Sequence, residues 1–147
     1  MLRRELRVGG RTGPAVRHPR TLTLQVIGGP AVLTVADLSF ISLRLVLPAL
    51  AACTDPDGDL VPMVKPQFEV GRERVGSGGV VRDPELRPSA VADVAQAAAD
   101  LRFSVADWYR VRCSGPAGNV EYFLWLRRDA AGMPSRRSRV PRSARST

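Results

Sequence analysis

Two short apolar segments, each followed directly by a charged residue, constrain the fold more than any other feature of the sequence. Ala31–Ala36 is a β-branched apolar run that ends at Asp37, and Leu60–Val64 is a second run that ends at Lys65. Uninterrupted apolar runs of this length are typical of strands buried in a parallel sheet. Because open α/β sheets place their ligands at the carboxyl ends of such strands, Asp37 and Lys65 are candidate site residues.

The pattern around these two runs predicts a sheet that begins with parallel strands and ends with an antiparallel pair. A helix with Ser42 as its N-cap is predicted after the first run, and a second helix is predicted from about Ser89 to Leu101. Two further strands follow at Phe103–Val111 and Val120–Leu126. The order strand, helix, strand, helix, strand, strand predicts an α/β fold.

Several shorter segments give local predictions. Thr21–Ile27 alternates in part and predicts a strand, whereas Asp55–Gly58 has the residue order of a tight turn. Pro48 is expected to interrupt the first helix, and Pro62 argues against a central position for the strand that contains it. Residues 69–85, rich in glycine, are predicted to form a long loop.

Basic charge is concentrated at the two ends of the chain. Residues 1–20 contain six Arg and one Glu, a net charge of +5, and residues 129–147 contain five Arg and one Asp, a net charge of +4. Residues 21–128 carry eleven basic and twelve acidic residues, a net charge of −1. Arg-rich ends can hold phosphate chains, but disordered ends of an Arg-biased protein look the same, and we favour the latter. We therefore predict an irregular segment over 1–20, one α/β domain over 21–128 and a disordered basic tail over 129–147.

The composition favours a soluble cytoplasmic protein. The longest apolar run, Leu45–Cys53, has nine residues and contains a proline, whereas a membrane span needs about 20 residues. No apolar segment of a secretory signal follows the basic first residues. Cys53 and Cys113 are too few to suggest a metal site or a disulfide framework, so a reducing compartment is expected.

Lys65 is the only lysine in a chain whose other 21 basic residues are arginine. Lysine can lose its proton when its surroundings demand it, and arginine effectively cannot. Pro66 favours an extended conformation for Lys65. A stray surface lysine is the alternative interpretation, and for Asp37 the alternative is a loop residue that caps nearby amides.

Glu121 interrupts the otherwise apolar strand Val120–Leu126. A carboxylate among buried residues is costly unless it is paired, and a lysine is its natural partner. The alternative is an alternating strand on which Glu121 faces water.

The glycine-rich loop at Gly76–Gly79 allows two interpretations. Gly71 and Gly76 have the spacing of a P-loop, but Ser77 stands where the lysine is required, so a flexible loop over a site is favoured. His18 lies in the irregular segment, and we assign it no role.

Four segments resemble the TlyA proteins, haemolysin-like ribosomal RNA 2′-O-ribose methyltransferases with an FtsJ-type catalytic domain. The similarity covers about residues 20–128 in order and spacing. The matching segments are Ala36–Leu43, Leu60–Gly71, Gly79–Pro84 and Gly118–Leu124.

The resemblance implies a catalytic Lys-Asp-Lys-Glu tetrad. By motif position Asp37 matches its aspartate, Lys65 its second lysine and Glu121 its glutamate. Lys65 would act as the base toward a cytidine ribose 2′-hydroxyl, with Asp37 and Glu121 orienting it and balancing its charge. The family implies S-adenosylmethionine as the cofactor and ribosomal RNA or a ribosomal subunit as the partner.

The chain also departs from the family pattern. The first lysine, the glycine-rich cofactor loop and the S4-like RNA-binding domain of the family find no match here, so the cofactor-binding residues are unknown. The family's sheet has strand order 3-2-1-4-5-7-6, and this chain resembles strands 4 to 7, the C-terminal half of a Rossmann-like class I methyltransferase sheet. We therefore expect no S-adenosylmethionine binding by this chain alone, and self-association through the bare edge of strand 4. The alternatives are an inactive remnant that binds RNA through its Arg-rich ends and, less favoured, a membrane-active haemolysin.

Overall fold

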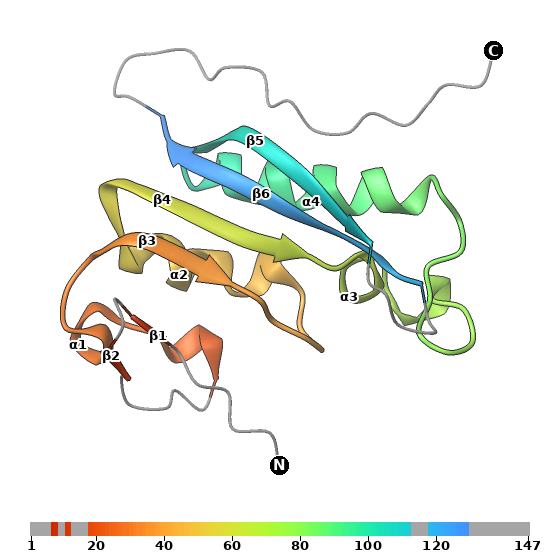
Figure 1. Cartoon of the computed structure of the whole chain (residues 1–147), viewed down its shortest axis with the longest axis horizontal. Coiled ribbons are helices and arrows are strands. Elements are labelled where there is room, and N and C mark those ends of the chain that lie inside the picture. Colours follow the sequence, from red (N-terminus) through yellow and green to blue (C-terminus); the bar gives the residue numbers. More distant parts are fainter. Residues whose placement is uncertain (1–6, 9–10, 13–17, 113–117, 130–147) are drawn as a thin grey trace.

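The computed structural model describes residues 7–8, 11–12, 18–112 and 118–129 (Figure 1). The sheet strands are β3 (Ala31–Ala36), β4 (Thr54–Val64), β5 (Phe103–Arg112) and β6 (Val120–Arg128), and β1 (Arg7–Val8) and β2 (Arg11–Thr12) form a separate antiparallel pair. The α-helices are α1 (Leu24–Ile27), α2 (Leu47–Cys53), α3 (Pro66–Glu69) and α4 (Leu86–Asp100). Three short 3-10 helices are η1 (Pro19–Thr21), η2 (Leu43–Leu45) and η3 (Arg72–Arg74). Most of the predicted irregular segment and of the basic tail lies outside the described residues.

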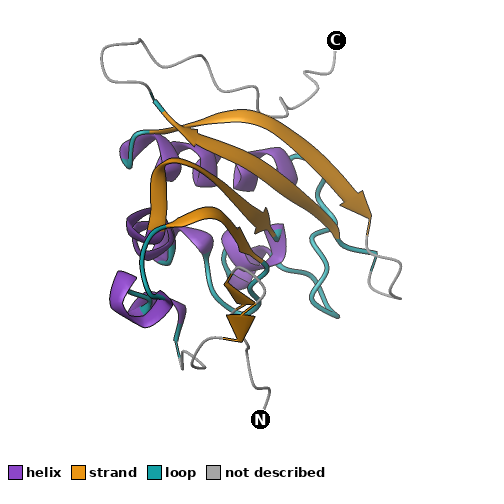
Figure 2. Cartoon of the chain, turned by 60° about the vertical axis from the view of Figure 1, so that its left-hand side comes forward, coloured by secondary structure: helices purple, strands orange, loops and turns teal. Residues whose placement is uncertain are grey.

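The main sheet has four strands in the order β3-β4-β6-β5. β3 runs parallel to β4, whereas β4 and β5 both pair antiparallel with β6. Figures 1 and 2 show α2 and α4 on the same face of this sheet. The predicted α/β fold, with parallel strands first and a terminal antiparallel pair, is therefore confirmed as a mixed four-stranded sheet.

The core lies between the sheet and these two helices. The inner face predicted for the second helix is buried in α4 at Val91, Val94, Ala95 and Ala98. The helix begins at Leu86, three residues before the predicted start, because a proline is tolerated in the first turn, where its missing N–H has no helical partner anyway.

The predicted interruption of the first helix is confirmed. Ser42 caps η2, its hydroxyl accepting a hydrogen bond from the Arg44 N–H at 3.2 Å, and a separate helix, α2, then begins with Pro48 in its first turn. The predicted apolar face stays continuous across the break. Its buried residues are Leu43, Val46, Leu47 and Leu50.

The strand predicted over Thr21–Ile27 is wrong. The segment ends η1 and then forms the one-turn helix α1, because the Thr23 hydroxyl accepts a hydrogen bond from the Val26 N–H at 3.4 Å. Gly28 ends the helix with φ of 81°, a left-handed conformation that glycine adopts without steric cost. Local capping decides the structure here, rather than partial alternation.

The predicted tight turn at Asp55–Gly58 is also wrong, because these residues belong to β4. They form a bulge: Ala31 pairs with Thr54, but Leu33 pairs with Asp59. The Asp57 N–H donates a hydrogen bond to Asp55 Oδ1 at 2.9 Å, a contact that is typical of turns and that forms here inside the strand. A Cβ at Gly58 would lie 2.9 Å from the Val32 carbonyl oxygen, which explains the glycine.

β4 is a central strand even though it contains Pro62. The register with β6 pairs Leu60 with Leu126 and then Met63 with Phe123, which passes over Val61 and Pro62. The ladder is therefore interrupted where proline has no N–H to donate.

β3 is parallel, as predicted, but it is not buried. Val32, Leu33 and Val35 are 76%, 57% and 60% exposed. Within the described residues β3 pairs only with β4, so its other edge lacks a neighbour. The apolar run therefore identified the strand correctly, but the burial that it predicted is wrong.

Candidate active site

Asp37 and Lys65 meet beyond the carboxyl ends of β3 and β4. The Lys65 Nζ lies 2.7 Å from Asp37 Oδ1 and donates a hydrogen bond to Ser39 Oγ at 3.2 Å. The side chain of Lys65 is only 12% exposed, whereas that of Asp37 is 61% exposed. Neighbouring parallel strands thus bring together two residues that are 28 positions apart in the sequence.

The lysine is held by its local sequence. Lys65 has an extended backbone, with φ of −113° and ψ of 99°, as Pro66 predicts. Pro66 is itself buried and begins α3. A mostly buried, ion-paired lysine excludes the interpretation of a stray surface residue.

Glu121 lies near the same end of the sheet, since its neighbour Tyr122 pairs with Val64, the last residue of β4. It is 8% exposed, so the water-facing interpretation is wrong. Its carboxylate Oε1 accepts a hydrogen bond from Gln67 Nε2 at 3.2 Å. In the described part of the chain no ion pair joins Glu121 to Lys65, and the amide of Gln67 takes the place expected for a lysine.

Sequence reasoning missed Gln67. Its Nε2 serves Glu121, and its Oε1 is buried without a hydrogen-bond partner among the described residues. Its position two residues after Lys65, at the end of a strand, was the signal that could have identified it.

Glu69 was missed too, because it was assigned to the long loop that follows. Its side chain is 1% exposed and accepts hydrogen bonds from Ser42 Oγ at 2.6 Å and from the Leu43 N–H at 2.7 Å, with Arg44 Nε at 3.6 Å. Burial raises the pKa of the Glu69 carboxyl group, and these hydrogen bonds and the Arg44 charge counteract part of the rise.

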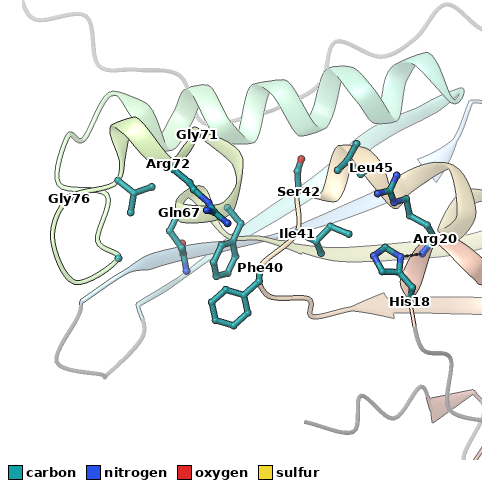
Figure 3. A pocket seen from close by; sticks show the side chains of 13 residues that line it. His18, Arg20, Phe40, Ile41, Ser42, Leu45, Gln67, Gly71, Arg72 and Gly76 are labelled. Carbon is teal, nitrogen blue, oxygen red and sulfur yellow. Dashed lines mark hydrogen bonds between the residues drawn. The ribbon is translucent and has the colours of Figure 1, made fainter. Parts of the chain in front are cut away.

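A cavity of about 660 Å³ is lined in part by Ser42 and Gln67, whereas Asp37, Lys65 and Glu121 are not among the described residues that line it. Figure 3 shows Phe40, Gln67 and Arg72 toward one end of it and His18 and Arg20 toward the other. His18, to which no role was assigned, lines the cavity and accepts the Arg20 N–H at its Nδ1 at 3.2 Å. The remaining lining residues are Ile41, Leu45, Phe68, Gly71, Val75, Gly76 and Gly79.

The glycine-rich loop forms part of the rim of this cavity, since Gly76 and Gly79 line it. Gly76 pairs with Val80 in an isolated antiparallel bridge, and Gly79 has φ of 75°. The loop therefore borders the cavity as a tight turn, consistent with the favoured interpretation of a loop over a site.

The family model for FtsJ-like methyltransferases matches residues 11–128, which is most of the chain. The chain belongs to this family. The resemblance found in the sequence is thereby confirmed, including the TlyA and haemolysin names that its relatives carry.

Its relatives extend well beyond the matched region. A "16S/23S rRNA (cytidine-2'-O)-methyltransferase TlyA" from Mycobacterium tuberculosis is 56% identical over 110 residues, which cover 75% of this chain and 41% of that protein. A "Putative rRNA methyltransferase YqxC" from Bacillus subtilis is 44% identical over 96 residues, or 61% and 32% of the two chains. This FtsJ-like chain therefore spans less than half the length of these relatives.

A solved structure shares the fold. The crystal structure of "a putative hemolysin from Lactococcus lactis" superposes with a TM-score of 0.68 at 37% identity, over 76% of this chain and 53% of that chain. Within the described residues, no helix combines the length and apolar character needed to cross a bilayer.

Proposed function

We propose that this chain supplies the substrate-activating part of an FtsJ-like domain that methylates a cytidine ribose 2′-hydroxyl in ribosomal RNA, with Lys65 as the base. The observation that carries the proposal is the 2.7 Å contact between Lys65 Nζ and Asp37 Oδ1 beyond two parallel strands. It lies in a chain whose relatives include an rRNA (cytidine-2'-O)-methyltransferase.

The chemistry assigned to the chain is the activation of a hydroxyl group. Lys65 first releases its own ammonium proton to solvent, its amine then accepts the 2′-hydroxyl proton as the oxygen attacks, and Asp37 balances the ammonium that results. Glu121 holds Gln67 by its amide and so fixes the segment that follows Lys65. S-adenosylmethionine, the donor that the family implies, supplies an electrophilic methyl group.

The cavity lacks the acidic groups that the cations of that donor need. S-adenosylmethionine carries a sulfonium, an ammonium and a carboxylate group, whereas the described lining of the cavity contains the exposed Arg20 and Arg72 and no carboxylate. The arginines can pair with the donor's carboxylate but not with its sulfonium or ammonium group. We therefore assign no residue of the described part to the cofactor.

The sheet topology favours a half-domain. The order β3-β4-β6-β5 corresponds to strands 4-5-7-6 of the family sheet, and the relatives are more than twice as long as the matched region. We propose that the donor binds to the half of a Rossmann-like sheet that this chain does not provide, and that ribosomal RNA or a ribosomal subunit is the partner.

A chimera tests the function. The portion of the Mycobacterium tuberculosis relative that this chain does not match is joined to residues 11–147, and transfer of a labelled methyl group to ribosomal RNA is measured. We expect cytidine 2′-O-methylation by the chimera. We expect Lys65→Arg to abolish it and to leave donor binding intact, because arginine keeps the charge but cannot accept the proton.

Arg74→Lys is the matched control, since it makes the reverse exchange at a side chain that is 59% exposed. It should leave methyl transfer unchanged. Near-normal turnover by the Lys65→Arg chimera would refute Lys65 as the base. A chimera that folds and binds RNA without transferring methyl groups would favour an RNA-binding remnant.

A further inference from the structure

Two loops meet beyond the carboxyl ends of β3 and β4. We call residues 37–42 the first loop and residues 65–71 the second loop. The second loop contacts the first loop and the start of η2. Successive residues of one segment contact successive residues of the other, beginning at the ends of the strands. These contacts join Lys65 to Asp37 and Ser39, Phe68 to Phe40 with ring centroids 5.1 Å apart, and Glu69 to Ser42 and Leu43.

The contacts of Glu69 differ from the others in burial and in charge. Both of its carboxylate oxygens accept hydrogen bonds, from Ser42 Oγ and from the Leu43 N–H, in a site where the side chain is 1% exposed. Hydrogen bonds to an ionised acceptor are stronger than neutral ones, and removal from water strengthens them further. The second loop is therefore fastened to the end of the first loop mainly by Glu69.

The first loop needs such a fastening. Phe40 has φ of 63°, a conformation that is unfavourable for a bulky residue and persists only where the surrounding structure imposes it. Phe40 as a whole is 85% exposed, so little of the restraint comes from its own burial. The ion pair at the other end of the loop involves an exposed carboxylate, and exposed ion pairs contribute little.

We propose that Glu69 is a positioning residue: it holds the first loop against the second loop and so keeps the Asp37 carboxylate in contact with Lys65. Its importance for methyl transfer rests on the proposed function. The contact itself can be tested without any methyl transfer.

The single lysine provides the readout. Lys65 and the amino terminus carry the only primary amines of the chain, so an acylating reagent modifies two groups, and the terminal amine is an internal reference. An ammonium group that is ion-paired and mostly buried reacts slowly. The ratio of the two acylation rates, measured by peptide mass spectrometry on the full chain, therefore reports the Lys65–Asp37 contact.

Three variants are compared with the unchanged chain. Asp37→Asn removes the ion pair directly and sets the upper limit of the response. Glu69→Gln keeps the side-chain length but loses the charge and one acceptor oxygen. Glu73→Gln is the matched control, because Glu73 lies four residues further on with a side chain that is 73% exposed.

Thiol labelling of Cys53 separates positioning from general loosening. Cys53 is 1% exposed in α2, away from the two loops, so its labelling rate reports opening of the core. The Cys53 peptide is measured in the same samples as the Lys65 peptide.

We expect Glu69→Gln to raise the Lys65 acylation ratio toward the Asp37→Asn value, by up to about fivefold, the factor that the loss of an exposed ion pair can produce. The Cys53 rate should stay as in the unchanged chain, and Glu73→Gln should change neither rate. If Glu69→Gln does not fold, Ser42→Ala removes one of the two hydrogen bonds, and a smaller rise is expected.

Three results would overturn the proposal. In the first, Asp37→Asn raises the acylation ratio of Lys65 to the amino terminus, but Glu69→Gln and Ser42→Ala leave that ratio unchanged. The second is a parallel rise of the Lys65 and Cys53 rates, which would show a role in stability alone. The third is no response to Asp37→Asn, which would remove the contact that Glu69 is proposed to maintain. None of these rates depends on methyl transfer, so the proposed function can fail independently.

Discussion

Glu121 is a buried carboxylate whose partner is neutral. A hydrogen bond from a neutral amide stabilises a buried carboxylate less than an ion pair with a cation does. It therefore offsets less of the free energy that is needed to remove the carboxylate from water, and Glu121 is not placed to maximise stability. Groups that do not maximise stability are common at functional sites, where activity and stability compete. The burial of Glu121 therefore supports its assignment to the site.

Replacing Glu121 by leucine should separate stability from activity. In this chain Glu121→Leu should leave the free energy of unfolding unchanged to within about 1 kcal/mol or raise it, because the lost hydrogen bond is offset by the removal of a buried charge. In the chimera it should lower methyl transfer by about 100-fold, the loss that a small misplacement of a catalytic group can cause. Urea denaturation and the methyl-transfer assay measure the two effects. A full rate for Glu121→Gln in the chimera would remove Glu121 from the site.

Glu69 should make stability depend on pH in an unusual direction. Burial raises its pKa, so the folded chain takes up a proton at a pH at which the unfolded chain has not yet done so. Where the native state binds more protons, stability increases as the pH falls. As the pH falls from neutrality toward the ordinary pKa of a glutamate, the free energy of unfolding of the unchanged chain should therefore rise relative to that of Glu69→Gln. Urea denaturation at several pH values, with Glu73→Gln as the control, checks the sign, and a difference that moves the opposite way would show a depressed pKa.

At the scale of elements, the sequence indicated the type and order of the helices and strands better than it indicated how deeply each one is buried. β-branched composition and helical spacing identified β3, β4 and α4, because long regular patterns reflect which face packs on the core. The short α1 was mistaken for a strand, since one capping hydroxyl decided its structure. The bulge in β4 was mistaken for a turn, because Asp55 and Gly58 have the same local chemistry in both.

The candidate site was predictable in part for the same reason. Asp37 and Lys65 follow regular strands, so topology brings them together. Gln67 and Glu69 sit in a one-turn helix, and their side chains form hydrogen bonds with distant segments. Nothing in the local sequence specifies such contacts, and only the packing of the two loops reveals them.

The edge strand β3 should mediate self-association. Its sequence, Ala31–Ala36, has no charge and no proline, and its unpaired edge can accept a second strand. Val35→Lys places a charge at a side chain that is 60% exposed and should therefore reduce association without loss of fold. Sedimentation velocity over a range of concentrations measures this. Thr34→Lys is an unsuitable control because Thr34 contacts Thr54, whereas Leu45→Lys changes an exposed residue away from β3.

An association that persists unchanged in Val35→Lys and disappears in Leu45→Lys would place the contact elsewhere. A chain that is monomeric at every concentration would show that β3 is an inert edge.

At the scale of the whole molecule, one face of the sheet carries the helices and the other bears exposed aromatic side chains. Tyr109 and Trp125 are 71% and 42% exposed. Sheets with parallel strands are normally covered on both faces. Because the net stability of even a complete domain is only about 5–15 kcal/mol, an uncovered face and an unpaired edge are costly. A sheet in a complete domain would have neither the open face nor the free edge of β3. Together these features support the half-domain proposal.

The half-domain proposal predicts that this chain alone does not bind S-adenosylmethionine. In the family the donor is expected to contact the strands and the glycine-rich loop that this chain does not match, and the described lining of the cavity offers no carboxylate to the donor's sulfonium and ammonium groups. Isothermal titration of the purified chain with S-adenosylmethionine should therefore give no saturable heat, whereas the chimera should give a binding isotherm. The Lys65→Arg chimera should bind as the unchanged chimera does, which separates binding from proton transfer. Saturable micromolar binding by the monomeric chain would show that the described residues suffice for the donor, and the half-domain proposal would then be wrong.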